Sequence, residues 1–338
     1  MITVIHAHEN HFESRWSEGL QNIPGATPMY SPSLRAFDLE IFSSSLEHDD
    51  SFVVMHSDTV VALVPLYRLK GDDGIIEYRY GGEYVRAPLV GYSKSDKVYG
   101  KIVQFVFEYI ASLAEKYSVL SHMTMIEGVE LIEGRNYHNY LTELAYVDDS
   151  TICQLIDLKK SEDELWSNVR KSYRPLINRA KKNYSYEVII SSNFDEQKCE
   201  EYRILHHKVA GRQTRSLKSF QLMYESIKND QGFLVIVRNE NEKTTAAHFF
   251  FYFGLYCVYG SSAIDDHEPS NAGIGQLGVW MGIITAQNLG CHYFDMGQLR
   301  LTNNPSKKEQ NIAQFKKGFG GRTVTVFRGK KKFKNEAI

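Results

Sequence analysis

The sequence lacks any cysteine pattern that would hold a metal or build a disulfide framework. Its four cysteines, Cys153, Cys199, Cys257 and Cys291, lie far apart and form no CxxC pair, and none has a histidine at a spacing typical of zinc sites. Cys257 and Cys291 lie within apolar runs and are expected to be buried thiols. The sequence therefore predicts no metal site, and this cysteine usage is typical of a reducing cytoplasm.

A membrane span, a signal peptide and a strong charge imbalance are missing as well. The first residues, MITVIHAHENHF, are too polar for a secretory signal. The most apolar stretch, residues 246–260, is shorter than a membrane span and is expected to form two buried strands around a glycine turn. A formal net charge of −2 argues against a surface that binds DNA throughout, although local basic patches remain. We expect a cytoplasmic protein with no integral membrane segment.

What is present fits an α+β protein of two domains. A length of 338 residues suffices for two cores, and the 21 Tyr and 18 Phe favour substantial sheet. In the first half, residues 51–56 and 59–67 read as a hairpin around a two-residue polar turn, and apolar residues recur at helical spacing over residues 97–116. A polar DDST stretch near residue 150 marks a boundary between domains at 1–150 and 151–338.

The second half repeats a similar order more clearly. A strand at 152–158 precedes a capping box at Ser161–Glu164 that starts a helix running to Lys182, with a kink expected at Pro175. Helices at 194–209 and 217–228 follow, and then an antiparallel meander. A helix at 274–289, the strand CHYFDM, a helix at 309–317 and a terminal strand RTVTVFR complete the chain. Each domain is thus predicted to be a mostly antiparallel mixed sheet flanked by helices.

One glycine motif, Gly273-Ile-Gly275-Gln276-Leu-Gly278, formally satisfies GxGxxG, and Asp295 follows Gly275 by 20 residues. A dinucleotide fold needs these glycines in a tight turn directly after a strand, whereas here a polar loop intervenes after an antiparallel meander. A glycine-rich helix start also presents backbone N–H groups to a phosphate or another anion. The alternative is a purely structural role, in which the helix packs closely through Gly278 and Gly282.

Two basic stretches are candidate anion-binding segments. Residues 170–182 carry six basic side chains and no acidic one, including Arg170 and Arg174. A second stretch, GRQTRS, contains Arg212 and Arg215. Most charge runs are solvated faces, but the missing acids make an anionic partner, such as a diphosphate or a tRNA backbone, equally reasonable.

Four segments together resemble the FemAB-like transferases in order and spacing: LWSNVRKSYRPLINRAKK, GRQTRS, the FDMG strand end and FKKGFGG. The resemblance covers most of residues 153–327, while the first half is similar only in outline. It implies two tandem GNAT-like domains, with the active groove in or beside the second. Members transfer an aminoacyl or acyl group to an amine, often during assembly of the cell envelope or of polysaccharides.

The resemblance also implies roles for individual residues. Phe315 and Lys316 match the Phe-Lys pair of the family motif, in which the lysine stabilises negative charge during transfer and the phenylalanine would shape the acceptor groove. Asp295 is a candidate general base, with a turn-capping role as the alternative. His248, among three phenylalanines, reads as a core histidine. The acidic loop Asp265–His267 either gates the groove or is solvated.

These residues predict an N-acyltransferase. An acyl donor, with acyl-CoA preferred to aminoacyl-tRNA, would place its phosphate on Gly273, Gly275 and Gln276. Arg170, Arg174, Arg212 and Arg215 would hold an anionic or lipid-linked acceptor, such as an amino-sugar or a peptide. No tightly bound cofactor is implied. The alternatives are an aminoacyl-tRNA-dependent peptidyltransferase and a non-catalytic module that binds a nucleotide-sugar or RNA.

Overall fold

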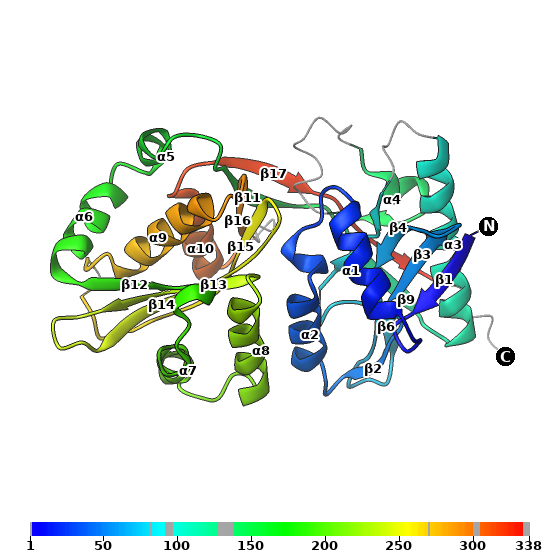
Figure 1. Ribbon diagram of the computed structural model, residues 1–338, viewed down its shortest axis with the longest axis horizontal. Helices are drawn as coiled ribbons and strands as arrows, with labels where there is room; N and C mark the ends of the chain where they lie inside the picture. Colours follow the sequence, from blue (N-terminus) through cyan, green and yellow to red (C-terminus); the bar gives the residue numbers. More distant parts are fainter. Residues whose placement is uncertain are drawn as a thin grey trace. The chain divides into compact units, whose positions relative to one another are not determined.

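The computed structural model describes residues 2–81, 83–91, 97–126, 138–269, 271–299 and 305–333, and it divides into two units (Figure 1). The division falls between Thr151 and Ile152, beside the predicted boundary. Two segments depart from the predicted ranges 1–150 and 151–338: residues 33–37 group with the second unit, and the chain from Thr325 groups with the first. The second departure arises because the last strand pairs with strands of the first unit.

The first unit contains two sheets. One is antiparallel, in the order β1-β3-β4-β8, with bounds Ile2–His6, Phe52–His56, Thr59–Val64 and Leu89–Val90. The other runs β10-β18-β9-β6-β5-β2 with β7 beside β9, over Val147–Asp148, Arg328–Lys332, Ser121–Met125, Ile76–Tyr78, Tyr67–Lys70, Leu46–Asp49 and Val85–Arg86. The predicted hairpin at 51–67 is confirmed as β3–β4.

Four helices occur among the described residues of this part of the chain: α1 at Phe12–Asn22, α2 at Pro32–Ile41, α3 at Lys97–Lys116 and α4 at Tyr140–Glu143. The predicted helix at 97–116 is confirmed as α3 with the same bounds. Its apolar stripe, including Ile102, Val106 and Ile110, is buried in the core of the unit.

The second unit is built on one sheet, in the order β12-β13-β14-β15-β16-β11-β17. The strands span Ser185–Ile189, Gly232–Arg238, Thr244–Phe253, Tyr256–Ile264, Tyr293–Gln298, Thr151–Asp157 and Arg322–Val326. The pairs from β12 to β15 are antiparallel, as the predicted meander requires, and β15 pairs with β16 in parallel. The apolar stretch 246–260 is the β14–β15 hairpin, which turns at Gly254 with a φ of 54°.

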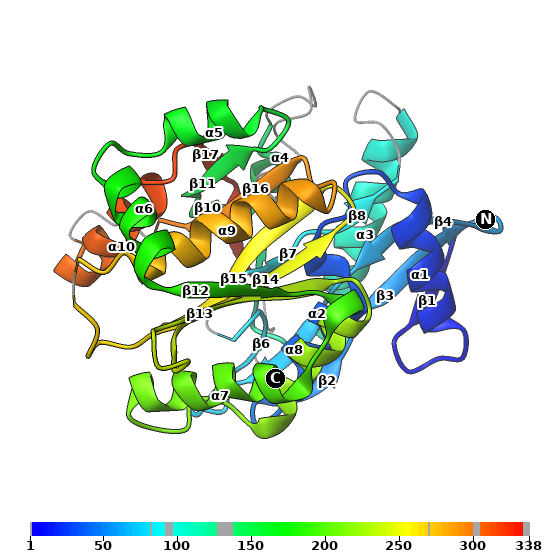
Figure 2. The ribbon, with the colours of Figure 1, turned by 60° about the vertical axis from the view of Figure 1, so that its left-hand side comes forward.

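Helices cover both faces of this sheet: α5 at Glu162–Asn168, α6 at Tyr173–Asn183, α7 at Glu196–Ala210, α8 at Leu217–Lys228, α9 at Ile274–Asn288 and α10 at Lys307–Lys317. Figure 2 shows α9 and α7 on opposite sides of β14 and β15. The contacts agree: His248 of β14 meets Gly278 of α9, whereas the next residue, Phe249, stacks on Tyr202 of α7. No helix within the described ranges is long and apolar enough to cross a membrane.

The helix expected to run from the Ser161 capping box to Lys182 is instead two helices. The capping box is confirmed, with the Ser161 and Glu164 side chains each bonded to the other's backbone. The chain leaves the helix after Asn168 and restarts at Tyr173, so Pro175 lies in the first turn of α6 and does not kink it. A proline fits there because the first N–H groups of a helix have no partner within the helix.

Candidate functional site

The centre of the second unit's sheet opens where β15 and β16 part. These parallel strands pair only from Tyr256 to Val258, opposite Tyr293 to Asp295, although β15 continues to Ile264. Gly260 is exposed despite lying in an inner strand, and a register shift beside it breaks the ladder with β14 between Phe249 and Phe250. A strand edge without a ladder partner offers N–H and C=O groups to an extended ligand. Sequence patterns missed this opening because strand divergence leaves no periodic signal.

The glycines of the GxGxxG motif all serve close packing of α9. A Cβ on Gly273, which has a φ of +78°, would collide with the backbone oxygen of Leu176, and one on Gly275 would lie 2.8 Å from Ile264 Cδ1. Added methyls on Gly278 and Gly282 would collide with the rings of His248 and Phe250. The close packing predicted at Gly278 and Gly282 is therefore confirmed. The helix α9 follows an antiparallel hairpin and a loop, unlike the tight strand-to-helix turn of a dinucleotide site.

A pocket of about 390 Å³ lies at the start of α9. Gly273, Gly275 and Gln276 line it together with Phe315, so the structure brings the predicted donor residues and one predicted acceptor residue to one pocket. The first N–H groups of α9 have no partner within the helix, and the helix dipole makes them attractive to negative charge.

Acidic side chains line the same pocket. Asp265 is buried, and its carboxylate pairs with Lys208 at 2.8 Å and with Lys243 at 3.2 Å. Burial by itself raises the pKa of Asp265, but the hydrogen bonds from Lys208, from the His267 amide and from Lys243 lower that pKa to about 2. The exposed Asp266 and the half-buried Glu268 leave the pocket mouth negative.

Lys316 reaches the end of β16. Its ammonium donates to the backbone oxygen of Gln298 at 2.8 Å, and a Cβ on Gly297 would lie 3.1 Å from that nitrogen. Gly297 itself, with a φ of +81°, donates its N–H to Asp295 Oδ1 at 2.6 Å. The structure thus places the two predicted catalytic residues around one short turn, and Asp295 caps that turn.

The rest of the FKKGFGG motif packs α10 onto the unit. A Cβ on Gly318 would collide with the Tyr173 ring, and methyls on Gly320 and Gly321 would crowd Asn168 and Leu155. Phe315 and Phe319 pack against Tyr173 with ring centroids 6.2 and 5.5 Å away. These close approaches explain why the motif contains three glycines and two aromatics.

Arg170 and Arg174 lie beside the break between α5 and α6. The Arg174 guanidinium donates to the backbone oxygens of Val169 at 3.0 Å and Ser167 at 2.5 Å, which are acceptors that the end of α5 leaves open. The exposed Arg170 lies over the Tyr173 ring and donates to the Gln314 oxygen at 3.2 Å. Arg174 therefore closes the end of α5, and Arg170 ties this break to α10.

Arg212 and Arg215 follow α7, a helix that lies on the other side of β14 and β15 from α9 (Figure 2). The exposed Arg212 makes no hydrogen bond or ion pair with any described residue. The half-buried Arg215 lies 3.5 Å from Ser261 Oγ, beside the open part of β15. The four arginines thus form two separate pairs.

Arg215 has polar neighbours and no carboxylate among the described residues. Its Nη2 lies 3.3 Å from Tyr202 Oη and 3.4 Å from His206 Nε2, and its buried Nε has no hydrogen-bond partner. Burial lowers the pKa of His206 to about 4, and the charge of Arg215 adds to this shift. A half-buried cation beside a neutral imidazole attracts an anion. The sequence predicted only Arg215 as a binding residue in this cluster. Tyr202 and His206 lie within a helix and belong to no motif, so nothing in the sequence distinguishes them.

His248 is a core residue, as its apolar surroundings predicted. Its ring is fully buried under α9, with Nδ1 3.0 Å from Tyr259 Oη, and burial lowers its pKa to about 3. It is therefore neutral at neutral pH and closed off from solvent.

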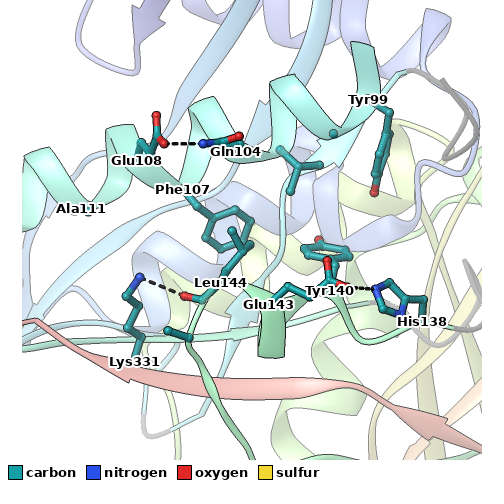
Figure 3. A pocket seen from close by; sticks show the side chains of 13 residues that line it. Tyr99, Gln104, Phe107, Glu108, Ala111, His138, Tyr140, Glu143, Leu144 and Lys331 are labelled. Carbon is teal, nitrogen blue, oxygen red and sulfur yellow. Dashed lines mark hydrogen bonds and ion pairs between the residues drawn. The ribbon is translucent and has the colours of Figure 1, made fainter. Parts of the chain in front are cut away.

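A larger pocket, of about 730 Å³, lies in the first unit between α3, α4 and β18 (Figure 3). Phe107 and Val103 are apolar residues of its lining. Its rim carries the pairs His138–Glu143 and Gln104–Glu108, each at 2.8 Å, while Lys331 donates to the Leu144 oxygen. None of the predicted site residues lines it.

No protein-family model and no curated protein sequence matches the chain. Its structure is nevertheless similar to solved ones. FemX aligns with a TM-score of 0.68 and 12% identity over 96% of both chains. L-PGS from Bacillus licheniformis aligns with a TM-score of 0.56 and 14% identity, over 93% of this chain and 95% of the other. A tandem GNAT protein from the clavulanic acid biosynthesis pathway aligns with a TM-score of 0.54 and 13% identity over the full length of both. The chain therefore shares its fold, two GNAT-like domains in tandem, with FemX and with the tandem GNAT protein.

Proposed function

We propose that the protein is an N-acyltransferase that moves an acyl group from a thioester donor, acyl-CoA, to an amino group of an anionic acceptor. The observation that carries this proposal is the position of Lys316, which holds an ammonium at the end of β16 where that strand has parted from β15. The similarity to FemX and to the tandem GNAT protein supports it at the level of the fold.

The reaction joins the amine nitrogen to the thioester carbonyl carbon and then breaks the carbon–sulfur bond. Negative charge collects on the carbonyl oxygen as the tetrahedral intermediate forms, and Lys316 stabilises it. The amine loses one proton, and the departing thiolate gains one, so the reaction is balanced without a redox partner. Asp295 acts as a positioning residue that holds the turn at Gly297.

The donor and the acceptor approach from opposite faces of the sheet. The pantetheine arm of the donor lies along the open edge of β15, and its phosphate meets the N–H groups of Gly275 and Gln276. Arg215 and Arg212 hold a carboxylate or phosphate of the acceptor beside Ser261. An amino-sugar or peptide precursor of the cell envelope has both the amine and the anion that this arrangement requires.

A second candidate is an aminoacyl ester donor such as aminoacyl-tRNA. Asp266 and Glu268 beside the start of α9 favour it, because they repel a diphosphate but attract the free ammonium of an aminoacyl group.

Thermal unfolding of the purified chain with acetyl-CoA, with desulfo-CoA, with aminoacyl-tRNA and with NAD separates these alternatives. We expect acetyl-CoA and desulfo-CoA to raise the unfolding temperature and NAD to leave it unchanged. Stabilisation by aminoacyl-tRNA alone would favour the second candidate, an aminoacyl ester donor. A rise with NAD alone would overturn both.

A further inference from the structure

Three histidines gather on the first unit, whereas every predicted site residue belongs to the second unit. His6 ends β1, His8 follows it in the next turn, and His48 lies on β2. The His6 and His8 rings are stacked with centroids 5.5 Å apart, and the His8 and His48 rings meet edge to face at 6.0 Å. Residues 42 positions apart in the sequence thus form one imidazole cluster.

The tautomer of His48 is set by a buried carboxylate. Its Nδ1 lies 2.8 Å from Asp50 Oδ1, and the other oxygen of Asp50 lies 3.2 Å from Arg68 Nε. Asp50 is 4% exposed and paired with Arg68, so it is the acceptor and His48 Nδ1 is the donor. The lone pair of His48 is then on Nε2, as in histidines that bind metals with a carboxylate behind them.

The other two rings also have a nitrogen to offer. His6 Nε2 is bonded to Tyr109 Oη at 2.7 Å, which leaves Nδ1. His8 is exposed, and no hydrogen bond or ion pair to its side chain is found among the described residues.

The spacing of the rings fits a shared ion. With a metal–nitrogen distance of about 2.0–2.1 Å and tetrahedral angles, two ligating imidazoles have centroids about 5 Å apart. The observed 5.5 and 6.0 Å are close to this value. Within the described ranges, only Asp265, Asp266 and His267 already have three ligand atoms within 4.8 Å of one another. The ligand nitrogens of His6, His8 and His48 do not all lie this close together, so the exposed His8 ring must turn to bring its nitrogen to a shared ion.

We propose that His6, His8 and His48 form a binding site for a divalent transition metal of the zinc type, with Asp50 as the carboxylate that orients His48. Neutral imidazoles are ligands that zinc prefers, and three of them leave a position for water. The ion joins β1 of one sheet to β2 of the other, so binding stabilises the first unit. This site is independent of the proposed acyl transfer.

Calorimetric titration of the untagged full chain with zinc chloride at pH 7.5 tests the site. We expect one ion per chain in the parent, and we expect His8→Ala and His48→Ala each to bind zinc at least tenfold more weakly than the parent chain does. His267→Ala serves as the matched control, because it removes the histidine of the acidic loop and should leave the affinity unchanged. His8 is exposed, so its variant keeps the fold, which the unfolding temperature without metal verifies.

Three results would overturn the proposal: no heat of binding in the parent chain, an affinity in His8→Ala and His48→Ala equal to that of the parent chain, or loss of binding in His267→Ala. A rise in the unfolding temperature with zinc that disappears in His48→Ala would support it.

Discussion

The ammonium of Lys316 on α10 donates a 2.8 Å hydrogen bond to the backbone oxygen of Gln298 at the end of β16. This bond directs a flexible side chain to one place, beside Gly297, where a Cβ would already lie 3.1 Å from its nitrogen. Because Phe315 precedes Lys316 and packs against Tyr173, the helix that carries the lysine is held as well.

Replacing Lys316 should remove most of the activity. We expect Lys316→Ala to lower kcat for acyl transfer by about 10²–10³-fold, the range for loss of one group that stabilises an oxyanion. Lys317→Ala is the matched control, since Lys317 is exposed and adjacent, and it should change kcat less than threefold. Product formation from labelled acetyl-CoA measures both. Equal activity in the two variants would exclude the role of Lys316.

Asp295 should tolerate an amide. Asn keeps an oxygen that can accept from the Gly297 N–H, so Asp295→Asn should keep kcat within about tenfold and leave its pH profile unchanged. Asp295→Ala loses the bond and should lower kcat further. A general base contributes typically 10²–10⁴-fold. A loss of that size in Asp295→Asn would therefore identify Asp295 as the base and contradict the positioning role.

Arg215 and His206 should be electrostatically coupled. Burial and then the charge of Arg215 lower the pKa of His206 to about 4. Arg215→Ala removes that charge, so the pKa of His206 should rise, as an NMR titration of the imidazole protons would show. The same variant should raise KM for an anionic acceptor at least tenfold. Arg212→Ala, which removes an exposed neighbour, should leave the His206 titration unchanged. A shift of the His206 pKa in Arg212→Ala as large as that in Arg215→Ala would refute the coupling.

Two glycine substitutions in helices should have opposite effects on stability. In α9, Gly278→Ala places a methyl in the His248 ring and should lower the free energy of unfolding by about 1–3 kcal/mol. In α3, Gly100 has no atom within 4 Å of an added Cβ, so Gly100→Ala should raise the free energy of unfolding by about 0.5–1 kcal/mol. Urea denaturation measures both changes. Similar effects of the two substitutions would show that the packing of α9 on His248 is loose.

The folded chain should lose stability in mild acid. Burial lowers the pKa of both His122 and His248 to about 3, whereas the ordinary value of 6.5 applies in the unfolded chain. Between these values the unfolded state binds more protons, so the free energy of unfolding falls as the pH drops from about 6.5 toward 3. Each ring contributes up to about 1.4 kcal/mol per pH unit. Urea denaturation from pH 7 to 4 should show a shallower decline for His248→Gln than for the parent chain, and parallel curves would contradict the buried, neutral state.

Local features of this fold could be predicted from sequence because they depend on neighbours along the chain. The helices α3 and α8 begin and end where apolar spacing places them, and Ser161 and Glu164 form the predicted capping box. The break between α5 and α6 was not predicted. It depends on Arg174, whose guanidinium satisfies the carbonyls that end α5, and a basic residue gives no such signal in a sequence.

The arrangement of the candidate site was harder to predict because it depends on pairing across the sheet. Phe315 and Gly273 lie 42 residues apart and line one pocket, which the family resemblance suggested but no spacing could show. Arg170 and Arg212 were both expected at one acceptor site, but Arg170 comes just before α6 and Arg212 just after α7, and these two helices pack against different partners. Which face a helix covers is decided by the order of strands, and the parallel pairing of β15 with β16 has no local signature.

The position of β18 has a consequence for how the chain folds during synthesis. Residues 328–332 lie between β9 and β10, inside the sheet of the first unit, and the ribosome adds them after every strand of the second unit. The N-terminal unit therefore cannot close its sheet until translation has passed through the whole of the second unit, whose strands have all been synthesised by then. Folding is expected to finish in the N-terminal unit, the reverse of the usual order in multidomain proteins.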